Sequence, residues 1–163
     1  MTIKNISFLE NLQNTIEKKL NNNPSFENIP VIAHRQDDLD NCLQEFLDAG
    51  SDLCILVMNP LPTTIKPRTS QVSFEHSLIR IQIIDSGFPN VKKMSALAAA
   101  EFVSHSLHNF RPDIQNWSGC LKIDTKLPWR EINDPQHLGR YILEVRFHTY
   151  GAKTQTTHHE NTH

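Results

Sequence analysis

Two segments of the chain alternate between apolar and polar residues with a period of two. Residues 77–85 have isoleucine at three alternate positions, and residues 140–149 have Tyr, Leu, Val and Phe at four. A period of two residues is typical of a β-strand that buries one of its faces. The sequence therefore predicts two strands, each with an apolar face toward the core and a polar face on the other side.

Three segments have apolar residues at helical spacing. The first covers residues 7–20 and begins with Ser7 and Glu10, which are three positions apart as in a capping box. The second covers residues 38–50, with aspartate at its start and glycine at its end. The third covers residues 91–110 and has an alanine-rich stripe, which would let the helix lie close to a sheet.

Three shorter segments complete the predicted sheet. Residues 29–35 contain Pro30, which has no amide donor, so this segment is expected at a sheet edge. Residues 53–58 are apolar throughout, as in a strand buried on both faces. Residues 120–124 form a short strand candidate. The apolar positions change face before residue 77, which predicts a bulge, a bend or a break near His76.

This order of elements predicts an α+β fold with one mixed sheet of about five strands and two to three helices mainly on one face. We expect a single domain over residues 1–152 and a disordered, His-rich tail over residues 153–163. Residues 59–71 and 124–138 are rich in proline and are expected as long loops. Such loops are usually functional or disordered, so residues 59–71 are either a surface loop or an arm that orders against a partner.

Composition excludes several classes of protein. The net charge is −2, and basic residues are scattered, so no basic field is available for direct nucleic-acid recognition. Three cysteines without a CxxC pair predict neither a disulfide framework nor a zinc knuckle. The first residues lack the apolar core of a signal peptide, and no apolar run is long enough to cross a membrane. We expect synthesis in a reducing cytoplasm and no membrane partner.

The chain contains none of the common catalytic motifs: no GxSxG, no Walker loop, no GxGxxG and no HExxH. Its five glycines do not cluster into a phosphate-binding loop. We therefore predict a protein that is not an enzyme, with no catalytic residues and no cofactor.

One constellation could support chemistry. Glu101, His105 and His108 are spaced i, i+4 and i+7, which places them on one helix face, opposite the alanine stripe. A carboxylate and two imidazoles could hold a divalent metal, as in a metal-dependent hydrolase. The alternative is a solvated helix face, on which histidines in the last turn interact favourably with the helix dipole.

Four segments carry a family resemblance. Residues 78–85 are Leu-Ile-Arg-Ile-Gln-Ile-Ile-Asp, residues 96–101 are Ala-Leu-Ala-Ala-Ala-Glu, residues 107–112 are Leu-His-Asn-Phe-Arg-Pro, and residues 141–147 are Tyr-Ile-Leu-Glu-Val-Arg-Phe. In this order they resemble the tail terminator and tail-completion (head–tail joining) proteins of long-tailed bacteriophages, which include prophage proteins of similar length.

The resemblance implies a structural assembly protein of the virion neck or tail, which acts after assembly in the bacterial host. Such a subunit caps the tail tube as a homo-oligomeric ring, often a hexamer. Its partners would be copies of itself, the tail tube protein and the head-completion or connector protein. A small adaptor of a secretion or toxin system is an alternative with the same assembly physics.

An assembly role needs surfaces for neighbouring subunits. The polar faces of the two alternating strands supply candidates, and a tryptophan in a long loop supplies another because Trp is enriched at interfaces. The predicted self-association or partner surface consists of Arg80, Gln82, Glu144, Arg146 and Trp129.

Overall fold

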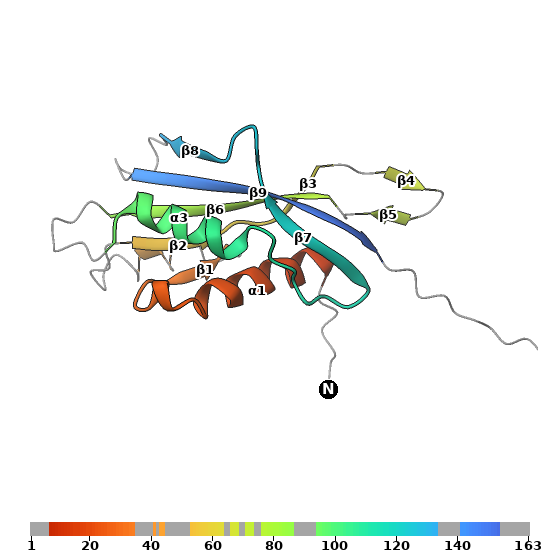
Figure 1. The fold of residues 1–163 in the computed structure, drawn as a ribbon, viewed down its shortest axis with the longest axis horizontal. Coiled ribbons are helices and arrows are strands. Elements are labelled where there is room, and N and C mark those ends of the chain that lie inside the picture. The colour runs from red at the N-terminus through yellow and green to blue at the C-terminus, as the bar shows by residue number, and fades with distance from the viewer. Residues whose placement is uncertain are drawn as a thin grey trace, which may run out of the picture.

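A computed structural model of the chain describes residues 7–34, 41, 43–44, 53–63, 66–68, 71–73, 76–86, 94–133 and 141–153. It confirms the α+β fold, with a mixed sheet of seven strands and helices packed against it (Figure 1). The sheet has two strands more than expected, because parts of both predicted long loops are strands. No helix in the described ranges has the length and apolar character that crossing a bilayer requires.

Five strands form the main path of the sheet, in the order β1-β2-β6-β9-β7. Their bounds are β1 (Val31–Ala33), β2 (Leu53–Val57), β6 (Ser77–Asp85), β9 (Tyr141–Lys153) and β7 (Trp117–Ile123). Only β1 and β2 are parallel, and the other neighbours are antiparallel. The edge position expected for the segment around Pro30 is confirmed, since β1 ends the path. All five residues of β2 are buried, as its apolar sequence predicted.

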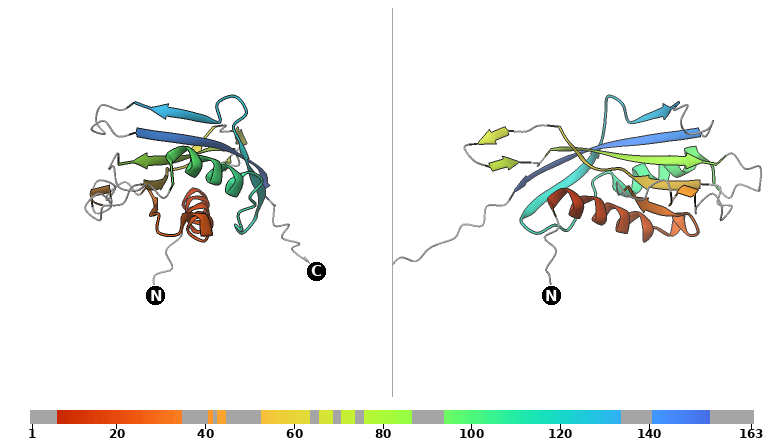
Figure 2. Two further views of the ribbon diagram at one scale, coloured as in Figure 1. Left: turned by 60° about the vertical axis from the view of Figure 1, so that its left-hand side comes forward. Right: turned by 180° about the vertical axis from the view of Figure 1, so that it is seen from behind.

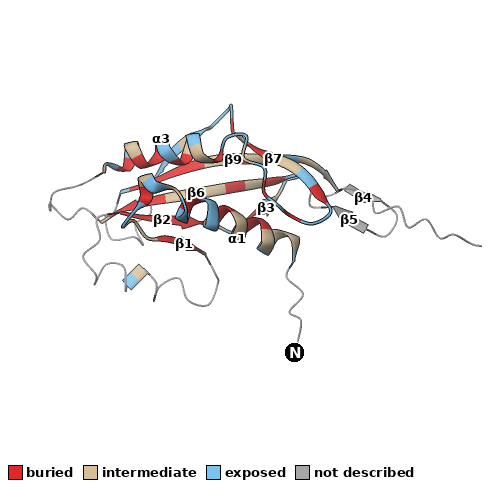
Figure 3. Ribbon diagram, turned by 60° about the horizontal axis from the view of Figure 1, so that its bottom comes forward, coloured by how far each residue is buried: buried red, intermediate tan, exposed pale blue. Residues whose placement is uncertain are grey.

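Two helices cover one face of this sheet. They are α1 (Phe8–Asn21) and α3 (Ala96–Leu107), and a short 3-10 helix, η1 (Pro24–Phe26), follows α1. The predicted capping box is present, because the Ser7 hydroxyl accepts from the Glu10 amide and the Glu10 carboxylate accepts from the Ser7 amide. Both helices turn their buried stripes toward the sheet (Figure 3). The stripe of α3 consists of Ala96, Ala99, Ala100, Val103 and Leu107.

The core lies between these helices and the sheet. It contains the alternate apolar residues of the central strands, among them Ile79, Ile81, Ile83, Val145 and Phe147, all fully buried. A second, smaller apolar cluster lies on the opposite face and consists of Cys54, Leu56, Ile84 and Ile142. Leu43, which is helical, packs against this second cluster. The rest of the helix predicted for residues 38–50 lies largely outside the described residues.

The helix expected over residues 91–110 is shorter at both ends where the structure describes it. Ser95 is its N-cap, with a hydroxyl that accepts from the Ala98 amide. At the other end His108 has left the helical conformation, and Asn109 has a positive φ of 65°. The helix therefore ends at Leu107, four residues earlier than the constraint of Pro112 alone would require.

The two segments expected as loops contain three complete strands and the first residue of a fourth. In place of a loop over residues 59–71, β3 (Leu61–Pro62) pairs with β6, and β4 (Lys66–Arg68) pairs with β5 (Gln71–Ser73). In place of a loop over residues 124–138, β8 (Trp129–Ile132) pairs with β9. The predicted break near His76 is confirmed, since β5 and β6 belong to different sheets on either side of it.

The β4–β5 hairpin forms a separate two-stranded sheet. It stands beyond the end of the main sheet in Figure 1 and in the view from behind (Figure 2, right). Part of the segment that was expected as either a surface loop or an arm is therefore a hairpin. Residues 154–163 of the predicted tail lie outside the described residues, whereas Lys153 ends β9.

Trp117 belongs to the main core and packs against Phe8. The strand expected at residues 120–124 begins earlier, at Trp117, which is buried and meets the ring of Phe8 edge to face at 5.5 Å. The indole lies over Gly119 and Gly151, which are cross-strand partners on β7 and β9. A Cβ atom added to Gly151 would lie 2.9 Å from the indole and 2.6 Å from the Ser118 carbonyl oxygen. Glycine at this position therefore makes room for the tryptophan.

Candidate assembly surface

The polar residues predicted on the two alternating strands lie together on the face of the sheet opposite α1 and α3. In the register of β6 and β9, Arg80 is opposite Arg146 and Gln82 is opposite Glu144. Three further residues join them from β8, from the connection before it and from β9. We call the whole set the polar strip: Arg80, Gln82, Asp124, Arg130, Glu144, Arg146 and His148.

Glu144 is the centre of the polar strip. Its carboxylate accepts from Arg130 Nε at 2.9 Å, from Arg146 Nη1 at 3.3 Å and from Gln82 Nε2 at 3.0 Å. The residue is 0% exposed, so the expectation that Glu144 faces a partner from the surface is wrong. The physical reason is β8, which supplies Arg130 as a cross-strand neighbour of Glu144. A buried carboxylate requires such donors, because an unpaired buried charge is costly.

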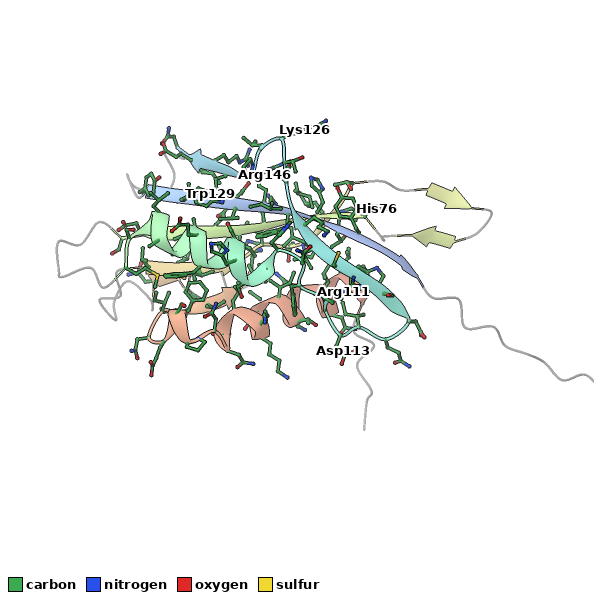
Figure 4. The ribbon with its side chains drawn as sticks, viewed as in Figure 1. His76, Arg111, Asp113, Lys126, Trp129 and Arg146 are labelled. Carbon is green, nitrogen blue, oxygen red and sulfur yellow. The ribbon has the colours of Figure 1, made fainter. Side chains whose placement is uncertain are left out.

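The chain between β7 and β8 fixes the position of Arg146. The Arg146 amide donates to the Pro128 carbonyl, and the Arg146 carbonyl accepts from the Asp124 amide, both at 2.9 Å. β9 thus changes its edge partner from β7 to β8 at this residue. Figure 4 shows Arg146 beside the loop that carries Lys126.

Asp124 holds this loop in place. One oxygen of its carboxylate accepts from the amides of Lys126 at 2.9 Å and Leu127 at 3.2 Å. The other lies 3.1 Å from His148 Nε2 and 3.8 Å from Arg146 Nε. Burial by itself would raise the pKa of the Asp124 carboxyl, but the two amides and His148 outweigh burial, so the pKa is lowered.

Arg80 is the one arginine of the polar strip without a carboxylate partner in the described part of the chain. The only hydrogen bond of its guanidinium group there is a long one, from Nη2 to the Asn59 carbonyl at 3.5 Å. Its Nε is buried and has no hydrogen-bond partner. Arg80 is also opposite Arg146, and like charges in directly opposed positions destabilise a sheet. The polar strip therefore has three guanidinium groups and two carboxylates.

Trp129 lies on the other face of the sheet and not in the polar strip. It is partly buried against the main core, and its Nε1 donates to Ser104 Oγ of α3 at 3.0 Å. The side chain thus ties β8 to the helix. Its predicted role at a partner surface stays a prediction, but in this chain it has an internal contact of its own.

The candidate metal ligands are all exposed, but they do not form one arc of a helix. Glu101 and His105 lie on α3, whereas His108 follows its end. His108 Nδ1 accepts from the Ile123 amide at 3.1 Å, which turns the imidazole toward β7. Across the described ranges, no three His, Cys, Asp or Glu side chains are grouped closely enough to hold a metal ion.

His105 instead lines an open groove between the end of α1 and the middle of α3. The groove has a volume of about 450 Å³. The rings of Phe26 and Phe102 meet beside it edge to face, with centroids 6.4 Å apart. Its lining residues are Lys19, Asn22, Asn23, Pro24, Ser25, Phe102, His105 and Ser106.

Sequence reasoning missed Arg130 and Asp124 because both lie in the segment expected as a loop. The run Trp-Arg-Glu-Ile at residues 129–132 does contain a weak alternation, with Trp129 on one face and Arg130 on the other. That signal is only four residues long, and Pro128 precedes it. The position of Asp124 depends on backbone contacts across the sheet, for which the sequence has no local signal.

No protein-family model matches this chain. No curated protein and no solved structure matches it either.

Proposed function

We propose that this chain is a structural assembly subunit, similar to the tail terminators of long-tailed bacteriophages. In this role it caps the tail tube as a homo-oligomeric ring and contacts the head-completion or connector protein. Its location would be the neck or tail of the virion. The resemblance in sequence suggested this function, and one structural observation supports it best.

That observation is the β4–β5 hairpin. It pairs only within itself in the described part of the chain and stands clear of the main sheet (Figures 1 and 2). An isolated two-stranded hairpin is at best marginally stable in water. Contact with a neighbouring subunit would stabilise such an arm and also use its open edges, which are templates for further strand pairing.

Exposed apolar side chains add support. Several large apolar side chains are exposed to solvent, on helices as well as on strands. In the part of the chain that the structure describes, they are Leu61, Leu97, Phe102, Leu127, Tyr141 and Tyr150. Aromatic and aliphatic residues of this kind form the centres of protein interfaces, with polar residues around them.

The experiment compares the full chain with a variant in which residues 66–73 are replaced by a short Gly-Ser linker. Sedimentation velocity and negative-stain electron microscopy measure the oligomer over a wide range of concentration. We expect the full chain to form closed rings at high concentration and the variant to stay monomeric. Circular dichroism should show that the variant keeps the main sheet and helices, since the hairpin is not part of that sheet. A strictly monomeric full chain at every concentration would contradict the proposal.

A further inference from the structure

We infer that Arg80 receives a carboxylate from a second copy of this chain, and that Glu101 supplies it. This inference rests on the proposed function, since it needs a neighbouring subunit. Its first basis is the charge imbalance of the polar strip. Arg130 and Arg146 share Glu144, and Arg146 is also near Asp124, whereas Arg80 contacts only a carbonyl oxygen at 3.5 Å.

The position of Arg80 makes a missing carboxylate costly. Arg146 is its direct cross-strand partner, so the two guanidinium groups repel each other. Arg146 is close to the carboxylates of Asp124 and Glu144. In the described residues, neither carboxylate forms an ion pair with Arg80. A carboxylate from outside would separate the two positive charges and supply acceptors in the forked geometry that arginine prefers.

The second basis is a pair of exposed carboxylates on the helical side of the molecule, one on α3 and one directly after η1. Glu27 and Glu101 are each next in sequence to one of the two rings, Phe26 and Phe102, that meet edge to face. Neither carboxylate has an ion-pair partner in the described part of the chain. Among the described residues, one face of the protein thus has an arginine without a carboxylate partner, and the other has two carboxylates that form no ion pair, although Lys19 and His105 line the groove next to Phe102.

The surroundings of Glu101 fit an interface better than those of Glu27. Leu97 is one helical turn before it and is 60% exposed, and Phe102 follows it and is 39% exposed. Residues four apart on a helix are neighbours, so Leu97 and Glu101 share one patch. Apolar side chains beside a charge match the usual interface, with an apolar centre and a polar rim.

A contact between two different surfaces is head-to-tail. Such a contact builds a ring when the rotation between subunits closes. The Arg80 surface and the Glu101 surface lie on opposite layers of the fold, since α3 covers the face of the sheet that Arg80 does not share. This arrangement is compatible with repeated addition of copies in one direction, as a ring requires.

The test is a charge exchange measured by sedimentation velocity. Arg80→Glu alone and Glu101→Arg alone each place like charges at the contact, and we expect each to weaken self-association by about tenfold or more. The double variant restores an opposite pair and should recover most of the affinity. Arg111→Glu is the matched control, because Arg111 is exposed and lies away from Arg146 and the strip around it (Figure 4). It should change association by less than about twofold.

The variant Arg80→Met shows whether the carboxylate that binds Arg80 comes from a second copy or from the same chain. Its unfolding is followed in urea, and its self-association by sedimentation velocity. A subunit contact predicts weaker association together with a monomer stability that is unchanged or higher, because the substitution removes the repulsion from Arg146. Lower monomer stability with unchanged association would overturn the inference and assign the carboxylate to the same chain. If rings form and the double variant is as weak as either single one, Glu101 is not the partner, and the proposed function stands without it. If no rings form from the unmodified chain, both the inference and the proposed function fail.

Discussion

The buried carboxylate of Glu144 allows the sharpest prediction about stability. The perturbation is Glu144→Gln, which keeps the size of the side chain and removes its charge. The hydrogen bond with Gln82 can survive, because the Gln82 amide can turn over and present its oxygen to the new NH₂ group. What the substitution removes is the charged acceptor of Arg130 and Arg146.

The expected magnitude follows from how well each arginine can be satisfied elsewhere. The Arg130 side chain is 44% exposed, so water replaces most of the interaction that it loses with Glu144. Arg130 therefore contributes about 0.5 kcal/mol to the loss in unfolding free energy. Arg146 is only 17% exposed, and Asp124 at 3.8 Å is too far from its Nε for a good hydrogen bond. The amide oxygen of the new side chain can still accept from Arg146, but a hydrogen bond to a charged group contributes about 1.5–3 kcal/mol and one to a neutral acceptor about 0.5–1.5 kcal/mol, so this bond weakens by about 1–1.5 kcal/mol. We therefore expect a total loss of about 2 kcal/mol.

Urea unfolding followed by circular dichroism measures this change. Glu131→Gln is the matched control, because Glu131 lies next to Arg130 on β8, is exposed and, among the described residues, has a carboxylate that accepts only from the Tyr141 hydroxyl. Its cost should stay below about 0.5 kcal/mol. If Glu144→Gln costs no more than Glu131→Gln, the polar strip does not stabilise the sheet, and the assignment of Glu144 as its centre is wrong.

Two further predictions concern other parts of the fold. Gly151→Ala should destabilise the protein by about 1–3 kcal/mol in urea, because the added methyl group meets Trp117 and a backbone oxygen, whereas Ser118→Ala at an exposed neighbour should cost less than about 0.5 kcal/mol. Asp124 has a lowered pKa, so its contribution to stability is complete above the ordinary value of 3.8 and is lost as the pH falls through the lowered value. The difference in unfolding free energy between the unmodified chain and Asp124→Asn should therefore shrink at acid pH, and a constant difference would contradict this assignment.

Much of the sheet could be predicted because its central strands have long, regular patterns. The alternation of apolar and polar residues predicted both β6 and β9 and the residues on each of their faces. The continuous apolar run of β2 predicted that this strand is buried. By contrast, β8 has four residues next to a proline, so its pairing with β9 is decided by tertiary contacts and not by local pattern. The pairing of β4 with β5 was not predicted for the same reason, since each strand has only three residues.

For the candidate surface, the sequence predicted only which residues of each strand share a face. The alternation placed Arg80, Gln82, Glu144 and Arg146 on the polar face, which the register confirms. It could not predict that Glu144 is buried, because that depends on Arg130 from an unpredicted strand. Which charges remain without partners is likewise a property of the folded chain.

We propose that this chain assembles with copies of itself through its projecting hairpin. Sedimentation velocity of the full chain and of the variant that lacks residues 66–73, at the same high concentration, tests this assembly. We expect a closed ring for the full chain and a folded monomer for the variant. Equal oligomeric states for the two proteins would contradict it.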